Sequence, residues 1–168
     1  GLETFNNGTA PKIAAARQAH FGSKGKDKYW YGHKEPASVD MQSGLINKVA
    51  ATPANVDDAK GLRHVCSDQG GVYADKAYCT APAQNALNRK GCHSAAIKKN
   101  NMTGKNRDKD RWLSKMRAPY ERVFSKRSKQ VRYRGQAKVQ FQLACNAIGH
   151  NLKRLVVLGV DKIPIVTA

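Results

Sequence analysis

The sequence predicts an α/β fold, and three observations support this prediction. Short apolar and aromatic runs typical of strands occupy the middle of the chain, helix-start residues lie between some of them, and long helical segments follow. At 168 residues the chain is long enough for one domain with a single hydrophobic core. We therefore expect an α/β arrangement that starts with an antiparallel hairpin.

The first predicted strands form a hairpin. Residues 1–28 are rich in polar and small residues and are expected to be poorly anchored. An aromatic run at residues 29–34 begins the strand region, and after an interruption at Pro36 it resumes at residues 38–40. Residues 45–51 then read as the return strand, which predicts an antiparallel start to the sheet.

Helices and short strands alternate after this hairpin. Acidic residues favour the start of a helix over residues 57–64, and a short strand at residues 71–74 ends at Asp75. A second helix is predicted at residues 81–89 and a last strand at residues 92–97. Because ligand groups of open α/β sheets collect at the carboxyl ends of strands, Asp75 is placed where a metal-binding carboxylate is expected.

The remaining segment, residues 108–158, is predicted to be helical and basic. Apolar residues recur at intervals of three and four from Trp112 to Phe124, beside a basic face. Pro119 interrupts this stripe and predicts a kink or a helix start. A second, less regular apolar pattern covers residues 141–155.

The charge of the chain indicates a polyanionic partner. Lys and Arg number 30 against 12 acidic residues, which gives a net charge of +18. An anionic membrane surface is the rival of nucleic acid, but the sequence has no long apolar span and no clean amphipathic basic stripe. Nucleic acid is therefore the favoured partner, and no membrane association is expected.

The cysteines predict no disulfide framework. The four, Cys66, Cys79, Cys92 and Cys145, have no CxxC spacing and follow no secretory signal, so reduced intracellular thiols are expected. His64 and His93 lie beside two of them, but the spacings match no common zinc module. Buried structural cysteines are the simpler interpretation.

Glu121 is the second acid of interest. Between Lys98 and Lys138 the chain has 15 Lys or Arg residues and only three acids, of which Glu121 is one. Either it forms a structural ion pair, which contributes about 0 to 1 kcal/mol when exposed, or it belongs to a metal site. Nucleases and polymerases use carboxylates to hold two Mg²⁺ ions at a phosphodiester, and nearby cations hold the backbone.

Around these two acids the chain resembles the DDE transposases of bacterial insertion sequences. It is most similar to the group whose closing region has a glutamate, an aromatic residue, lysines and an Arg-Tyr-Arg-Gly motif. The matching segments, in order, are residues 30–34, 38–40, 43–46, 54–58, 72–78, 117–126, 131–135 with Lys138, and 151–152.

The resemblance implies a ribonuclease H-like domain, with a mixed sheet and flanking helices, that cuts and joins DNA using three carboxylates and Mg²⁺ or Mn²⁺. Asp75 and Glu121 match two catalytic, metal-binding carboxylates of the family, and Arg117 matches its Arg-x-x-x-Glu signature. The family's lysine seven residues after the glutamate falls on Ser128, which leaves Lys126 or Lys129 as substitutes.

A basic cluster around Tyr133 has two interpretations. It is either a solvated helix face or a DNA contact, because Arg suits bidentate phosphate binding and Tyr can stack. The resemblance favours DNA. The predicted DNA-binding residues are thus Arg117, Lys126, Lys129, Arg132, Tyr133, Arg134 and Lys138.

The chain also departs from the family. The first catalytic aspartate should end a strand upstream of residue 30, but residues 1–27 contain no such strand, and Asp40 belongs to another family position. In the related fold the first strand lies between the second and the fourth. We therefore expect a sheet that lacks its first central strand and a divided core, unless residues 1–20 or another chain fill the gap or the chain packs differently.

These features define the predicted organisation and function. Residues 1–28 form a poorly ordered or non-family leader, residues 29–158 a partial transposase catalytic domain, and residues 159–168 a non-family tail. The expected function is that of a truncated or decaying transposase copy in the bacterial cytoplasm, associated with the nucleoid, which binds DNA but is inactive or impaired. A homodimer, or a chain that completes the sheet, is a further expected partner. The alternative is a non-catalytic basic protein of a ribonucleoprotein assembly, which metal dependence would distinguish.

Overall fold

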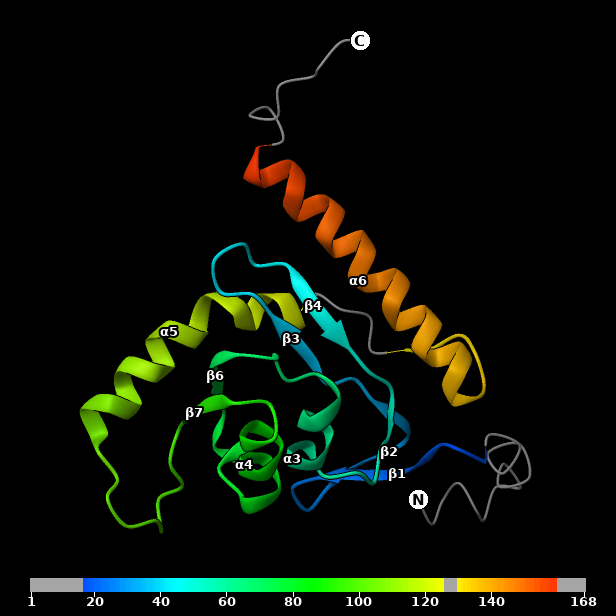
Figure 1. The fold of residues 1–168 in the computed structure, drawn as a ribbon. Coiled ribbons are helices and arrows are strands. Elements are labelled where there is room, and N and C mark those ends of the chain that lie inside the picture. The colour runs from blue at the N-terminus through cyan, green and yellow to red at the C-terminus, as the bar shows by residue number, and fades with distance from the viewer. Residues whose placement is uncertain (1–16, 126–129, 160–168) are drawn as a thin grey trace.

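The computed structural model describes residues 17–125 and 130–159. Strands and helices alternate along these residues, and two long helices follow (Figure 1). The strands are β1 (His20–Lys24), β2 (Lys28–Lys34), β3 (Ala37–Val39), β4 (Ile46–Val49), β5 (Thr52–Pro53), β6 (Gly70–Ala74) and β7 (Cys92–Ala96). The helices are α3 (Asp58–Gly61), η1 (Leu62–His64), η2 (Lys76–Tyr78), α4 (Ala81–Asn88), α5 (Arg107–Ser125) and α6 (Gln136–Leu158).

The described strands form three separate sheets in a mixed α/β arrangement. One is antiparallel in the order β1-β2-β5, another is the antiparallel pair β3-β4, and the third is the parallel pair β6-β7. No described strand joins β6-β7 to either antiparallel sheet by hydrogen bonds. The predicted separation of the initial strands from the strand before Asp75 is therefore present in the described residues.

The main core lies between α3, η1, α4 and β7. Its buried side chains include Leu62, Val65 and Leu87, and Val72 of β6 packs against them. The side chain of Asp57 accepts a hydrogen bond of 2.8 Å from the backbone N of Ala59, which caps α3 and fixes its start. This core supports one face of β6 and so positions the chain that leads to Asp75.

A second, smaller core lies between α6 and β4, where Val139 and Leu143 pack against Ala51. Amide side chains on this face of α6 bond to the backbone of the strand. Asn151 accepts from Ile46 N at 2.8 Å and donates to Ile46 O at 3.0 Å, and Gln140 bonds Ala51 N at 2.7 Å and Val49 O at 3.0 Å. The outer edge of β4 is thus closed by helix side chains instead of another strand.

One detail differs from the sequence expectations, and two others follow them. The segment expected to be a leader contributes β1, which pairs with β2 from His20 opposite Gly32 to Lys24 opposite Lys28. The return strand β4 pairs with β3, and beyond the interruption at Pro36 the pairing continues in β5, which pairs with His33 and Lys34 of the aromatic run. Pro119 lies inside α5, whose ribbon bends along its length (Figure 1).

No helix among the described residues is long and apolar enough to span a membrane.

Candidate carboxylate site

Asp75 lies where the sequence predicts it, directly after β6. Its backbone is extended, and its carboxylate accepts a hydrogen bond of 2.6 Å from the backbone N of Lys76, which caps the short helix η2. The side chain remains more than half exposed. One oxygen therefore orders the local turn while the carboxylate still faces solvent at the strand end.

Arg117 lies between the carboxylates of Asp75 and Glu121. The Arg117 guanidinium lies 3.8 Å from Asp75 Oδ1 through one nitrogen and 3.8 Å from Glu121 Oε1 through the other. Arg117 and Glu121 are one helical turn apart on α5, so both reach the same side of that helix. Two acids that are distant in sequence are thus brought to opposite sides of one cation.

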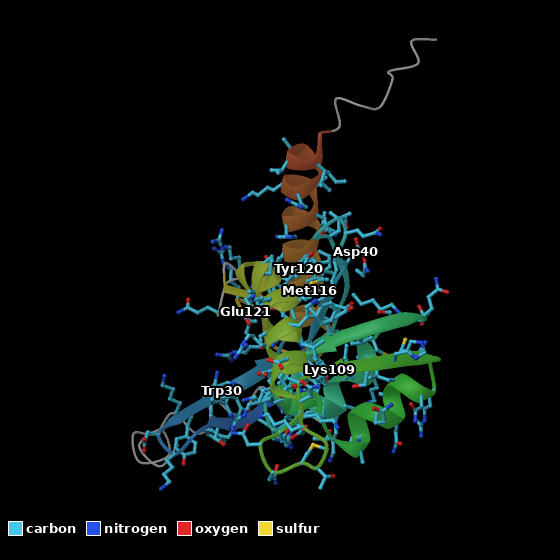
Figure 2. All side chains as sticks on the ribbon, turned by 90° about the vertical axis from the view of Figure 1, so that its left-hand side faces the viewer. Trp30, Asp40, Lys109, Met116, Tyr120 and Glu121 are labelled. Atoms are coloured by element: carbon cyan, nitrogen blue, oxygen red, sulfur yellow. The ribbon has the colours of Figure 1, made fainter. Side chains whose placement is uncertain are left out.

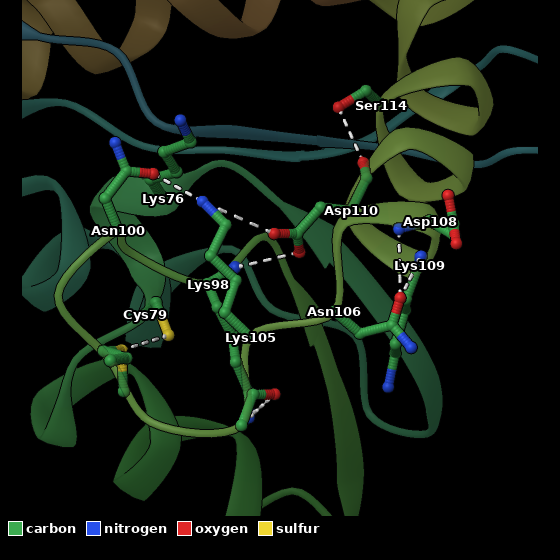
Figure 3. Close-up of polar contacts among 12 residues, drawn as sticks. Lys76, Cys79, Lys98, Asn100, Lys105, Asn106, Asp108, Lys109, Asp110 and Ser114 are labelled. Carbon is green, nitrogen blue, oxygen red and sulfur yellow. Dashed lines mark hydrogen bonds and ion pairs between the residues drawn. The ribbon is translucent and has the colours of Figure 1, made fainter.

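The first turn of α5 is anchored firmly, which helps to place this pair (Figure 3). Asn106 Oδ1 accepts from the backbone N of Asp108 and of Lys109, both at 3.0 Å. Asp110 accepts from the backbone N of Lys98 at 3.3 Å and lies 3.8 Å from Lys105 Nζ. These contacts tie the helix to the loop that follows β7.

The carboxylate pair opens onto a cavity of about 380 Å³. Its walls come from β3, η1, β6 and α5, and it is mainly apolar away from Asp75, Arg117 and Glu121. Tyr78 also lines it, and burial, followed by the nearby charges of Asp58 and Asp75, raises the pKa of its phenol. Tyr78 is therefore a neutral wall of the site at ordinary pH.

Asp40, the other strand-end acid in the sequence, is not part of this site. Its carboxylate accepts hydrogen bonds from Ser43 N at 2.7 Å and Ser43 Oγ at 2.5 Å, and these bonds lower the pKa of Asp40. It thus stabilises the turn between β3 and β4. The third carboxylate that lines the cavity is instead Glu35, just before β3.

Two residues of the site were not singled out as functional in the sequence. Tyr120 was expected only as a member of the apolar stripe, but its hydroxyl donates to Met41 O and it lines the cavity. Figure 2 shows Tyr120 and Glu121 on α5, and Asp40 on the turn between β3 and β4. Glu35 gave no signal, because a lone glutamate before Pro36 resembles an ordinary loop residue.

The predicted DNA-binding residues divide into separate groups. Arg117 lies at the carboxylate pair, whereas Arg132, Tyr133 and Arg134 are exposed on the chain that leads into α6. Lys138 is exposed in the first turn of α6. Lys126 and Lys129 lie outside the described residues. The structure therefore does not bring the basic cluster into the cavity of Asp75 and Glu121.

The donor set of the site fits a hard divalent cation in part. Carboxylate oxygens are the ligands that Mg²⁺ and Mn²⁺ prefer, and Asp75 and Glu121 present such oxygens on either side of the Arg117 guanidinium. No group of three His, Cys, Asp or Glu side chains within the described residues is arranged to hold a metal ion. Asp75 and Glu121 are thus two carboxylates near one cation, and a divalent ion would need further ligands beside them.

Comparison with known proteins identifies the family of the chain. The family model described as Transposase DDE domain matches residues 7–152, which is most of the chain. Searches of curated proteins and of solved structures found no match. The α/β arrangement is compatible with a ribonuclease H-like fold, and enzymes of this family generally use divalent metal ions. The chain belongs to the transposase DDE-domain family.

Proposed function

We propose that this chain is a DNA-binding transposase domain of the insertion-sequence type in which Asp75 and Glu121 hold a divalent ion. The observation that carries the proposal is the approach of both acids to Arg117 at the mouth of one cavity, in a chain of the DDE family. The metal would be Mg²⁺ or Mn²⁺, which stabilises charge on the oxygens of a phosphodiester during cleavage.

The residues of the chain have distinct roles in this proposal. Asp75 and Glu121 supply metal ligands, and Arg117 keeps their carboxylates together before the ion binds. The exposed Arg132, Arg134 and Lys138 hold DNA phosphates, and Tyr133 stacks or packs against the strand. Lys126 and Lys129 extend the same basic segment.

We also propose that the domain is impaired until a further strand completes it. Pro36 O accepts a hydrogen bond from Ala50 N, so the carbonyl of Pro36 faces the strand that contains β4. Because backbone groups alternate in direction along a strand, the N–H and C=O groups of Ala37 and Val39 face away from β4. Ala74 O likewise accepts a hydrogen bond from Ile97 N, so the backbone groups of Ala74 face β7 and those of Gly71 and Tyr73 face away from it. Both pairs of residues line the cavity.

The cavity is therefore bordered by two strand edges that no described strand pairs with. A parallel pair such as β6-β7 is normally buried on both faces, yet several of its residues are exposed. An extended strand from another segment or another chain would pair with β3 and β6 and could bring a third carboxylate. Without it one weakly held ion cannot stabilise both the attacking and the leaving oxygen.

DNA binding is tested by the salt dependence of affinity for a plain duplex. If about eight cations meet phosphates, log K should fall with log salt at a slope near −7. Changing Arg132, Arg134 and Lys138 together to Gln should make the slope shallower by about 3, whereas a charge-matched change of Lys60, Arg63 and Arg89 should leave it nearly unchanged. Affinity independent of salt would contradict the proposal.

Cleavage of the same DNA in the presence of Mg²⁺ distinguishes an impaired domain from an active one. Residues 1–168 are expected to bind without cutting, and a longer protein with an added strand that ends in Asp is expected to cut. Robust cutting by residues 1–168 would contradict the impairment. A protein that binds DNA but never responds to metal would support the alternative, a non-catalytic nucleic-acid-binding protein.

A further inference from the structure

An exposed apolar stripe runs along the outer face of α6. Its members are Phe141, Cys145, Ile148, Leu152 and Leu155, spaced alternately by four and three residues. The relative exposures of Phe141, Ile148 and Leu152 are 66%, 58% and 60%. Large apolar side chains at this spacing form the contact seam of paired helices, and they are seldom left in water.

The stripe is not used by the fold of the described residues. The buried side chains that hold α6 to β4, Val139 and Leu143, lie on the other side of the helix. Arg154 still bonds to Ser43 O in the turn between β3 and β4, and the last turn of α6 extends beyond the other described elements (Figure 1). The spacing therefore marks a surface for a second helix.

The charge pattern argues against nucleic acid as the occupant. Residues 139–152 contain no Lys, Arg, Asp or Glu, in a chain whose net charge is +18. A surface for phosphates would carry cations. A contact between two copies of a strongly basic chain, in contrast, needs a segment where like charges do not meet.

The two ends of the stripe differ in their surroundings. At its N-terminal end, Phe141 and Cys145 line a cavity of about 400 Å³ together with Val131 and Tyr133 of the preceding segment. Hydrogen bonds from Arg132 N to Gln142 and from Gln142 to Gln130 O hold that segment against the helix. Toward the C-terminal end of α6, Leu155 is exposed, and the helix ends beyond the other described elements (Figure 1).

We propose that α6 pairs with α6 of a second copy in an antiparallel, two-fold arrangement. The protruding Leu155 end of each copy enters the Phe141 cavity of the other, so the same surface serves both partners. Antiparallel pairing also sets the two basic bodies at opposite ends, whereas parallel pairing would bring their charges together. In this register Cys145 lies opposite the partner's Leu152. The inference is independent of the metal site, and because Tyr133 lines the same cavity, the dimer is tested without nucleic acid.

The experiment measures the mass of the nucleic-acid-free protein in solution by light scattering. The expected mass is twice that of the 18.4 kDa chain at tens of micromolar protein. Changing Ile148 and Leu152 together to Gln should give the monomer mass. Val157→Gln is the matched control, because Val157 is 73% exposed on the opposite side of α6 and should leave the dimer intact.

Oxidation then tests the orientation, in a Cys79→Ser background. Leu152→Cys should give a covalent dimer through the native Cys145, and adding Cys145→Ser should abolish it. A wild-type protein that stays monomeric, or a dimer that survives the double Gln change, would overturn the proposal. A Cys145 to Cys145 bridge without the Leu152 change would overturn the antiparallel arrangement.

Discussion

At the scale of single residues, the central feature is one guanidinium between two carboxylates. Arg117 compensates the negative charge of Asp75 and Glu121, which would otherwise repel each other when no metal is bound. The contacts of 3.8 Å are long for ion pairs, so little would be lost if a divalent ion replaced Arg117 at the proposed site. The geometry explains how two neighbouring acids are tolerated beside a strongly basic segment.

Asp68 shows the other use of an acid in this chain. Lys48 Nζ lies 2.8 Å and Lys90 Nζ 2.7 Å from its two carboxylate oxygens, which tie β4 to the chain around β7. The hydrogen bonds with Lys48 and Lys90 lower the pKa of Asp68 from 3.8 to about 2. A lowered pKa marks a carboxylate that stabilises the folded state when ionised.

This pKa predicts an acid-sensitive step in stability. Because the folded-state pKa is lower than the unfolded one, the contribution of Asp68 is complete above about pH 4 and is lost as pH falls toward 2. Asp68→Asn should lower stability at neutral pH and flatten the pH dependence in this acid window. Denaturant unfolding of both proteins across the window measures the effect, and parallel pH profiles would refute it.

At the scale of elements, α6 takes the place of a strand along β4. Gln140 and Asn151 bond with backbone groups that an adjacent strand would otherwise satisfy. Gly135, with a φ of 89°, turns the chain into this helix. The β3-β4 pair therefore has one edge closed by a helix and the other open to the carboxylate cavity.

Gln140→Ala tests this edge closure. It removes two hydrogen bonds and leaves Ala51 N and Val49 O without their partner, so the free energy of unfolding should fall by about 1 to 3 kcal/mol. Gln84→Ala is the control, because Gln84 bonds only the exposed side chain of Asn88 and should change stability by less than about 0.5 kcal/mol. If both variants lose the same free energy of unfolding, the amide contacts of Gln140 do not stabilise the edge of β4.

At the scale of the whole molecule, local signals predicted most elements and few of their contacts. The start of α3 at Asp57 and the strand before Asp75 follow from capping and apolar patterns that act over a few residues. The amide contacts of Gln140 and Asn151 could not be predicted, since polar residues on a helix resemble a solvated face.

The candidate site divides in the same way. Asp75 is identifiable by its strand end, and Glu121 by its basic surroundings together with the family resemblance. Their convergence depends on how α5 crosses the end of β6, which no local pattern encodes. Glu35 and Tyr120 enter the cavity only through this packing, so sequence alone gave no reason to select them.

The most direct measurement of the central claim is Mn²⁺ binding followed by paramagnetic resonance, without DNA. The account predicts one weakly bound ion in the unchanged protein, and at least a tenfold loss of affinity in both Asp75→Asn and Glu121→Gln, which corresponds to about 1.4 kcal/mol. Asp68→Asn, which removes an acid paired elsewhere, should bind Mn²⁺ as the unchanged protein does. Equal Mn²⁺ affinity in all four proteins would contradict a metal site at Asp75 and Glu121.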